Sequence, residues 1–333
     1  MTPSNEHRVL YLGYGSPDLY AMIRAAVLPG FELMTLDADD ETMRLEKLAQ
    51  ADAVIVAASK FTAERIAAAK KLKFVHHQGV GYHDTIDLAA LAQTGVPLAI
   101  TPGGTATGVS EHAMLMMLAV TRRLSFMDSE LRQGRWHVNS HRHVTYQLAG
   151  KTIGIIGFGR IGTAVADRLR PFGVKVIYHD ILDFPAERDR KHDAVRRSFE
   201  QLLAESDIIT IHIPLTVKNR GFIGARELAR MKPTAFLVNT ARGGLVDEPA
   251  LAAALDQGTI LGAALDVFER EPAPKDHPLY RFPNVVLTPH IAAGTRDAFE
   301  AKMAQIFKNL DAFFNGRPVE DEVDYKADLV VSR

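Results

Sequence analysis

The sequence predicts an α/β fold made of two Rossmann-like or flavodoxin-like domains, each a doubly wound parallel sheet, with an active-site cleft between them. Short apolar runs alternate with helix-like segments along the chain, the pattern of βα units around a parallel sheet. A Gly-rich motif directly follows one of these runs. The 333 residues correspond to two domains at about 150 residues each.

The composition excludes several classes of function. A formal net charge of -1 gives no electrostatic basis for a nucleic acid or a membrane as the main partner. The absence of cysteine excludes disulfides, thiolate metal sites and cysteine nucleophiles. Residues Met1–Arg8 are polar and lack the apolar core of a signal peptide, so we expect a cytoplasmic protein.

The N-terminal part of the chain contains a first series of βα units. Its expected strands are Arg8–Leu12, Ala53–Ala57, Phe74–His76 and Val96–Ile100. Its expected helices are Asp18–Leu28 and Thr62–Lys70. A turn-rich segment then closes the series, and a long helix should follow with Ser110 near its start. This helix is apolar all round over Ala113–Val120, which predicts burial on most faces.

The Gly-rich motif opens a second series of βα units. The expected strand Thr152–Ile156 is followed at once by Gly157-Phe158-Gly159-Arg160-Ile161-Gly162 and then by a helix. The first glycine permits the tight turn, the second lets a pyrophosphate approach, and the third lets helix pack on strand. The helix N-terminus, with Arg160 and Ile161, supplies N–H groups to the phosphates. The segment therefore predicts a dinucleotide site.

Asp180 indicates which dinucleotide binds. It ends the next expected strand, 23 residues after Gly157. A carboxylate at this place accepts hydrogen bonds from the ribose hydroxyls of NAD and repels the 2′-phosphate of NADP. We interpret Arg188 and Arg190, further along, as a solvated charged face. The predicted cofactor is NAD.

Three further strands each end next to a residue whose side chain can transfer a proton or bind an anion. Arg242 follows Ala235–Asn239, Glu271 follows Leu261–Leu265, and His290 follows Val285–Thr288. Ligands bind at the carboxyl edge of an open parallel sheet, so the three side chains and a nicotinamide ring can meet there.

These three residue types suit the reduction of a 2-oxo acid. Histidine is the natural proton donor near neutral pH. A carboxylate beside the histidine stabilises the imidazolium and fixes the ring. Arginine offers a planar fork for a carboxylate and a polarised carbonyl. The pattern therefore favours a hydride-transferring dehydrogenase.

The chain closely resembles the D-isomer-specific 2-hydroxyacid dehydrogenases, the group that contains phosphoglycerate dehydrogenase and glyoxylate/hydroxypyruvate reductase. The motifs that carry the resemblance are Gly79–Tyr82, Leu148–Thr152, Gly157–Gly162, His212–Thr216, Asn239–Gly243, Leu265–Phe268 and Thr288–His290. The resemblance implies Arg242 as the substrate clamp, His290 as the acid/base and Glu271 as its partner. It also implies that Asp266 lies near the nicotinamide amide and that the backbone of Val80 and Gly81 holds the substrate carboxylate.

The resemblance also implies the domain layout and the assembly. A discontinuous substrate-binding domain would comprise residues 1–103 and 292–333, and an NAD-binding Rossmann domain residues 104–291. A homodimer would form through the helix and connector Ser110–Leu148. The expected cofactor-binding residues are Gly157, Gly159, Arg160, Ile161, Gly162, Asp180, Thr240, Ala241 and Asp266.

The expected activity is NAD-dependent, reversible hydride transfer between a D-2-hydroxy acid and its 2-oxo acid, with a substrate like glyoxylate or hydroxypyruvate favoured. D-3-phosphoglycerate dehydrogenase is an alternative, although only Lys60 offers charge in the loop Ala57–Lys60, where that enzyme usually has arginine. A non-catalytic, corepressor-like NAD sensor on the same fold is a second alternative. Turnover of a 2-oxo acid separates enzyme from sensor.

Two groups of histidines are open to more than one interpretation. His137, His141 and His143 lack a carboxylate or cysteine at ligand spacing, so a polar dimer arm is favoured over a metal site, and no metal is expected. The segment His76–Gln78 ends a strand and either shapes substrate selection or packs in the interior.

Overall fold

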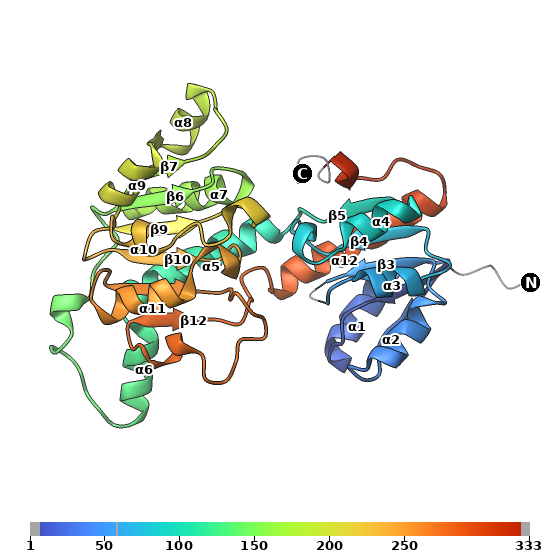
Figure 1. Ribbon diagram of the computed structural model, residues 1–333, viewed down its shortest axis with the longest axis horizontal. Helices are drawn as coiled ribbons and strands as arrows, with labels where there is room; N and C mark the ends of the chain where they lie inside the picture. Colours follow the sequence, from blue (N-terminus) through green and yellow to red (C-terminus); the bar gives the residue numbers. More distant parts are fainter. Residues whose placement is uncertain (1–6, 58, 328–333) are drawn as a thin grey trace, which may run out of the picture. The chain divides into compact units, whose positions relative to one another are not determined.

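The computed structural model describes residues 7–57 and 59–327 and divides the chain into two compact units. Unit 1 comprises Met1–Thr105 and Arg296–Arg333, and unit 2 comprises Ala106–Thr295. Ala58, in the loop compared above with phosphoglycerate dehydrogenases, lies outside the described residues. Each unit contains a mainly parallel sheet with helices on both faces (Figure 1), which confirms the predicted fold class.

Unit 1 has a six-stranded sheet in the order β13-β5-β4-β3-β1-β2. The strands are β1 His7–Tyr11, β2 Phe31–Met34, β3 Ala53–Val56, β4 Phe74–His77, β5 Leu98–Ile100 and β13 Glu322–Val323. The first five are parallel, in the order of flavodoxin-like sheets, and β13 pairs with β5 in the antiparallel sense.

Helices cover both faces of the unit 1 sheet. They are α1 Pro17–Ala26, α2 Glu41–Leu48, α3 Ala63–Ala68, α4 Leu88–Thr94 and α12 Arg296–Phe314. Helices α1 and α12 pack on the face that carries Val9 and Phe74, and α2, α3 and α4 on the face that carries Leu10 and Val54. Local signals set the helix ends: Ser16 caps α1 by accepting from the Leu19 N–H, and Pro17 follows at the first helical position.

Unit 2 has a seven-stranded parallel sheet in the order β12-β11-β10-β9-β6-β7-β8. The strands are β6 Thr152–Ile156, β7 Lys175–His179, β8 Ala194–Arg196, β9 Ile208–Ile211, β10 Phe236–Asn239, β11 Gly262–Leu265 and β12 Val285–Leu287. The order reverses at β6, between β7 and β9, and this switch point is where nucleotide-binding sheets take up their ligand.

Helices also cover both faces of the unit 2 sheet. The helices of this unit are α5 Thr105–Thr121, α6 Leu124–Arg132, α7 Arg160–Leu169, α8 Ala186–His192, α9 Phe199–Glu205, α10 Ala225–Leu228 and α11 Glu248–Asp256, and α6 has no buried residue. Helices α5 and α7 pack on the face with Ile155 and Tyr178, and α9, α10 and α11 pack on the face with Ile156 and Ile209.

Helix α5 begins earlier than predicted, at Thr105, five residues before Ser110. Its burial on most faces over Ala113–Val120 is confirmed, because six of these eight side chains are buried. Leu115 and Leu118 are the exceptions, at 51% and 37% exposed. The all-round apolar pattern therefore combines a core-facing side with an exposed apolar side.

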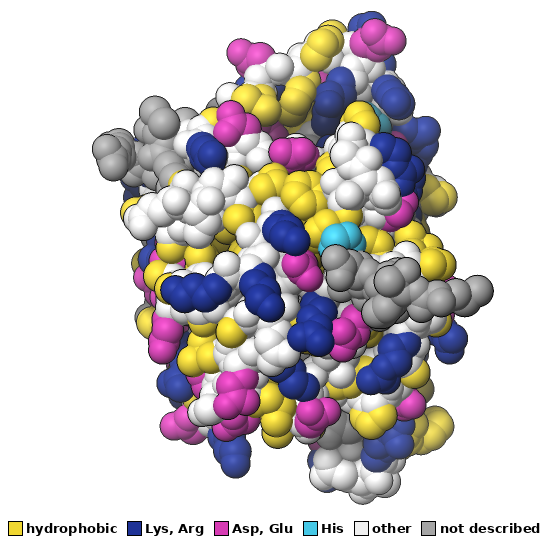
Figure 2. All heavy atoms as spheres, turned by 90° about the vertical axis from the view of Figure 1, so that its right-hand side faces the viewer, with side chains coloured by type: hydrophobic (Ala, Val, Ile, Leu, Met, Phe, Trp, Pro, Cys, Tyr) yellow, Lys and Arg dark blue, Asp and Glu magenta, His cyan; other side chains and the backbone are white. Residues whose placement is uncertain are grey.

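The surface mixes charges of both signs. Figure 2 shows one face, on which Lys and Arg side chains alternate with Asp, Glu and hydrophobic ones, as expected for a net charge of -1. In the described part of the chain, none of the helices has the length and apolar character required to cross a membrane.

Candidate active site

The residues predicted to bind the cofactor and do the chemistry in unit 2 follow the carboxyl ends of parallel strands, at one edge of the sheet. They are Gly157–Gly162 after β6, Asp180 after β7, Thr240–Arg242 after β10, Asp266 and Glu271 after β11, and His290 after β12.

The three glycines of the phosphate loop differ in their surroundings. Gly157 has a φ of +91°, and a Cβ there would lie 2.6 Å from the carbonyl oxygen of His212. A Cβ at Gly162 would lie 2.1 Å from the carbonyl oxygen of Gly157, so only glycine lets α7 approach β6 this closely. A Cβ at Gly159 would meet no atom within 4 Å. The first and third glycines therefore pack tightly against other backbone atoms, whereas space remains beside Gly159. A bound pyrophosphate needs this space.

Helix α7 begins at the open part of this loop. Gly159 is its N-cap residue and makes no side-chain capping bond, so the first N–H groups of the helix, including those of Arg160 and Ile161, are available to a ligand. Arg160 is exposed and Ile161 is half-buried. The loop and helix fit the diphosphate of a dinucleotide.

Asp180 follows β7 and its carboxylate contacts the phosphate loop. One oxygen accepts the N–H of Phe158 at 2.7 Å, and the other accepts the N–H of Leu182 at 2.9 Å. The residue is half-buried. The carboxylate therefore lies beside the Gly-rich turn, where a ribose attached to the bound diphosphate would present its hydroxyls.

The interpretation of Arg188 as part of a solvated face is wrong. Its Nη2 donates to the carbonyl oxygen of Phe158 at 2.6 Å, and its guanidinium lies 4.1 Å from the ring centre of Phe184. The Phe158 ring stacks on Tyr178 at 3.9 Å. The sequence did not reveal this contact because it depends on where α8 returns to the loop. Arg190 is exposed, as expected.

His290 and Glu271 form a hydrogen-bonded pair. Nδ1 of His290 lies 2.7 Å from Oε2 of Glu271, and their side chains are 46% and 37% exposed. Burial by itself raises the pKa of the Glu271 carboxyl, but the hydrogen bonds from His290 and the Phe268 N–H outweigh it and hold that pKa below its usual value. The pair uses one ring nitrogen of His290 and leaves Nε2 for a substrate.

Arg242 lies on the loop next to this pair. Its charge helps to lower the pKa of Glu271. The adjacent Gly243 makes the approach possible, since a Cβ there would lie 1.8 Å from the carbonyl carbon of Phe268. Thr240 is buried and Ala241 half-buried on the same loop. The structure thus brings together the arginine, the carboxylate and the histidine.

Asp266 is fully buried, and the loop after β12 is built around it. Its carboxylate accepts hydrogen bonds from Thr288 Oγ1 at 2.6 Å and from the N–H groups of Ile291 and Ala292, both at 2.9 Å. Burial raises the pKa of Asp266, but these donors and His112 outweigh it and lower the pKa overall. Its contact with the nicotinamide amide stays a prediction.

Sequence reasoning missed His112 and Thr288 as parts of this site. Nε2 of His112 lies 3.0 Å from Thr288 Oγ1 and 3.4 Å from Asp266 Oδ1. His112 belongs to α5, 176 residues before Thr288, and nothing in the sequence indicates which strand this helix crosses.

Val80 and Gly81 lie in unit 1, between β4 and the short helix Tyr82–Asp84. The Val80 side chain is 38% exposed. Their contact with a substrate carboxylate stays a prediction. Among the described residues, no group of three or more His, Asp or Glu side chains could hold a metal ion.

Comparison with known proteins gives concordant results. Residues 114–292 match the sequence profile of the D-isomer specific 2-hydroxyacid dehydrogenase, NAD binding domain. The glyoxylate reductase of Thermococcus litoralis is 42% identical over 278 residues, covering 82% of this chain and 83% of its own length. A D-3-phosphoglycerate dehydrogenase of Archaeoglobus fulgidus is 39% identical over 81% of this chain but only 51% of its own length. The crystal structure of a glyoxylate reductase from Paecilomyes thermophila superimposes with a TM-score of 0.81 at 29% identity, covering 96% of this chain and 99% of that one.

These findings confirm the predicted family and NAD as the cofactor. The profile covers more than half of the chain and includes the phosphate loop, Asp180 and the Arg242–Glu271–His290 group. The chain belongs to the D-isomer-specific 2-hydroxyacid dehydrogenase family and is an NAD-dependent enzyme of that family.

Proposed function

We propose that this protein reduces a small, unphosphorylated 2-oxo acid of the glyoxylate or hydroxypyruvate type with NADH, and oxidises the D-2-hydroxy acid in the reverse direction. The observation that carries the proposal is the 2.7 Å contact of His290 with Glu271 beside Arg242. A proton donor, its carboxylate partner and an anion clamp are the groups that this reaction needs.

His290 is the proton donor in this mechanism. Because Nδ1 is bonded to Glu271, the ring presents Nε2 to the substrate. In reduction, Nε2 gives its proton to the carbonyl oxygen, and Glu271 stabilises the charged ring before the transfer. In oxidation, the neutral ring takes the hydroxyl proton. One ring position thus serves both directions.

Arg242 acts as the clamp. Its guanidinium can bind the substrate carboxylate and the adjacent carbonyl oxygen with two parallel N–H groups. This holds the carbonyl carbon in one orientation and stabilises the negative charge that develops on its oxygen.

The backbone of Gly157, Gly159, Arg160, Ile161 and Gly162 would hold the cofactor diphosphate, and Asp180 the ribose hydroxyls. The open face at Gly159 and the free N-terminus of α7 support this assignment. Thr240 and Ala241 would border the nicotinamide. When bound, the reduced nicotinamide supplies the hydride that adds to the carbonyl carbon.

The preference for a substrate without a phosphate has two supports. The glyoxylate reductase relative matches this chain over most of its own length, whereas the phosphoglycerate dehydrogenase relative extends well beyond the match. In addition, Lys60 is the one cation of the segment Ala57–Lys60.

A substrate panel tests the proposal. NADH oxidation would be followed with glyoxylate, hydroxypyruvate, pyruvate and 3-phosphohydroxypyruvate at equal concentrations. The largest kcat/KM is expected for glyoxylate or hydroxypyruvate. A larger value for the phosphorylated acid would make the protein a phosphoglycerate dehydrogenase, and no turnover with any acid would favour the NAD sensor.

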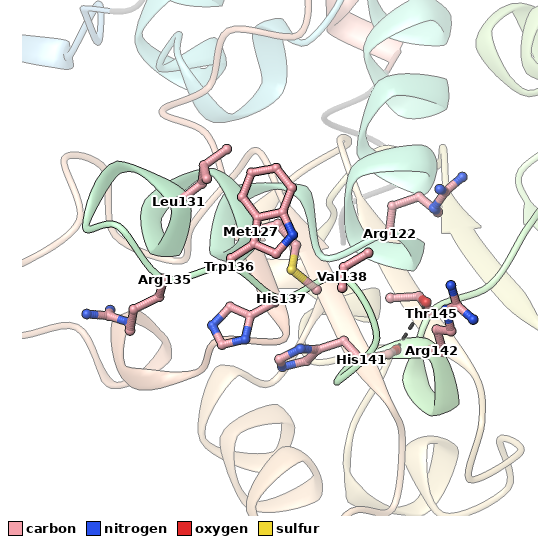
Figure 3. A pocket seen from close by; sticks show the side chains of 10 residues that line it. All are labelled: Arg122, Met127, Leu131, Arg135, Trp136, His137, Val138, His141, Arg142 and Thr145. Atoms are coloured by element: carbon pink, nitrogen blue, oxygen red, sulfur yellow. Dashed lines mark hydrogen bonds between the residues drawn. The ribbon is translucent and has the colours of Figure 1, made fainter.

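We further propose a homodimer formed through the arm, defined as α5, α6 and the connector up to Leu148. Exposed apolar side chains gather on it, namely Leu115, Leu118, Leu124, Leu131, Trp136 and Val138, which are 37–76% exposed. Three of these side chains, Leu131, Trp136 and Val138, line a hollow of about 450 Å³ on the arm. Figure 3 shows Arg135 at one end of it and Arg122 and Arg142 at the other. A second copy of the chain would bury this apolar surface.

The dimer is tested by light scattering after size exclusion. The unmodified chain should elute as a dimer, and Trp136→Glu should yield monomers because it places a charge in the buried contact. Val195→Glu changes an exposed apolar residue outside the arm and should leave the dimer intact. A monomeric unmodified chain would contradict the proposal.

We also propose that the protein works in the cytoplasm, because a reductase that consumes NADH needs a compartment in which NADH is regenerated. Cell fractionation with an antibody against the protein tests this location.

A further inference from the structure

The buried residue Asp266 accepts several hydrogen bonds from the loop that carries His290. The backbone carbonyl of Asp266 accepts the N–H of His290 at 2.6 Å. Its carboxylate accepts Thr288 Oγ1 and the N–H groups of Ile291 and Ala292, at 2.6–2.9 Å. The position of the proposed proton donor therefore depends on how Asp266 and Thr288 are held.

His112 from helix α5 holds this pair from the other side. Its Nε2 lies 3.0 Å from Thr288 Oγ1 and 3.4 Å from Asp266 Oδ1, and its side chain is 10% exposed. An ionised carboxylate can only accept hydrogen bonds, so the Thr288 hydroxyl must donate to Asp266. The oxygen of that hydroxyl then accepts from His112, which places the proton of His112 on Nε2. The donors run in one direction, from His112 to Thr288 to Asp266.

His290 needs such support because its backbone is strained. Its φ is +54°, a region that residues other than glycine adopt at a free-energy cost. A strained residue stays in place only where its surroundings fix it, and here the fixing groups are the N–H bond to Asp266 and the anchored residues on either side. A weaker anchor would let His290 leave its position beside Glu271.

We infer that His112 is a positioning residue for proton transfer: its Nε2–H fixes Thr288 and Asp266, and through them the loop that presents His290. This inference rests on the proposed function, since it assigns His112 to the same reaction. The contacts of His112 are with Thr288 and Asp266 and not with the ring of His290, so its loss should slow the chemical step. Binding of NADH should change little, because the phosphate loop and Asp180 are proposed to hold most of the cofactor.

Two amide substitutions test which ring nitrogen matters. The side-chain amide of Gln reaches the place of Nε2, and that of Asn reaches only the place of Nδ1. His112→Gln should keep kcat within about threefold of the unmodified enzyme, because its N–H can still donate to Thr288. His112→Asn should lower kcat by about tenfold or more, with the KM for the 2-oxo acid and the Kd for NADH within about twofold.

The neighbouring Glu111→Gln is the matched control. Glu111 is 62% exposed and pairs with Arg168, away from Thr288, so its substitution should leave kcat unchanged. Equal kcat values for His112→Asn and the unmodified enzyme would overturn the inference. Equal losses in the Asn and Gln variants, accompanied by weaker binding of NADH by fluorescence, would overturn it as well, because they would show a general packing role. No turnover by the unmodified enzyme would instead overturn the proposed function.

Discussion

Each unit of this molecule places a histidine at or after the carboxyl end of a parallel strand, but the two histidines have different surroundings. His76, at the end of β4 in unit 1, is fully buried, with Nδ1 3.2 Å from the His77 carbonyl and Nε2 3.0 Å from the amide of Asn309 on α12. His290, after β12 in unit 2, uses one ring nitrogen on Glu271 and is 46% exposed. A shared topology supplies the position, and the neighbouring helices and loops decide whether the side chain becomes structural or reactive.

The neighbours of His76 are also held by hydrogen bonds within unit 1. The amide oxygen of Gln78 accepts the hydroxyl of Tyr11 at 3.1 Å, and Nδ1 of His77 accepts the N–H of Gly79 at 3.0 Å. These contacts favour packing over substrate selection for His76–Gln78, the alternative that the sequence left open.

The largest difference between the two histidines should appear in turnover. His290→Ala removes the proton donor and should lower kcat of reduction by about 10²–10⁴-fold, while the Kd for NADH measured by fluorescence stays unchanged. His76→Gln, which changes the buried histidine of unit 1, should leave kcat at pH 7 unchanged. A His290→Ala enzyme with nearly normal turnover would remove His290 from the mechanism.

The second difference should appear in acid stability. Burial lowers the pKa of His76 to about 3, whereas the unfolded chain takes up a proton near pH 6.5. The unfolded state therefore binds more protons below pH 6.5, and the stability contributed by neutral His76 is lost as the pH falls from 6.5 toward 3. Between pH 7 and pH 5 the loss amounts to about 2 kcal/mol.

Calorimetry of the unmodified protein and of His76→Gln at pH 7 and pH 5 measures this loss. Gln does not titrate, so the unfolding temperature of the variant should fall less on acidification. His212 in unit 2 also has a pKa of about 3 because of burial, and its contribution remains in both proteins. Equal shifts in the two proteins would assign the acid sensitivity to groups other than His76.

Apolar periodicity was sufficient to predict the fold class and most of the interior strands. It did not reveal β2, Phe31–Met34, β8, Ala194–Arg196, β13, Glu322–Val323, or β9, Ile208–Ile211. The first three are short strands at a sheet edge, where one side stays exposed and the apolar run is too short to recognise. β9 lies inside the sheet, but its four residues are too few to show a period. The sheet order was equally invisible, because it depends on contacts between residues far apart in the chain.

The site shows a similar limit. Arg242, Glu271 and His290 were predictable because each follows a strand, and the carboxyl ends of parallel strands share one edge. His112 and Arg188 lie on helices, and their contacts with Thr288 and Phe158 depend on how those helices pack. Sequence patterns predict which residues lie at the edge of the sheet, but not which helices contact those residues and hold them in place.

The next largest effect should appear in the preference of the enzyme for NADH over NADPH. The unmodified enzyme should prefer NADH to NADPH by at least about tenfold in kcat/KM, because Asp180 repels the 2′-phosphate. Asp180→Ala should reduce this preference and also weaken NADH binding, since the Phe158 N–H loses its acceptor. Asp180→Asn keeps an acceptor without the charge, so it should reduce the preference with less loss of NADH binding. Equal use of both cofactors by the unmodified enzyme would contradict the role of Asp180.

The smallest effect should come from Arg188, which supports the phosphate loop without reaching the chemistry. Asp180 holds the N–H of Phe158, and Arg188 holds its carbonyl at 2.6 Å, so the loop is fixed on both sides before a ligand arrives. Arg188→Ala should therefore weaken NADH binding by about fivefold, because the loop must then be ordered on binding, and leave kcat at saturating NADH unchanged. Arg190→Ala, an exposed arginine of the same helix, should change neither quantity. Fluorescence titration with NADH measures both variants. If Arg188→Ala bound NADH as tightly as the unmodified enzyme, the phosphate loop would owe its shape to its glycines and to Asp180 alone, and α8 would be a surface helix without a part in cofactor binding.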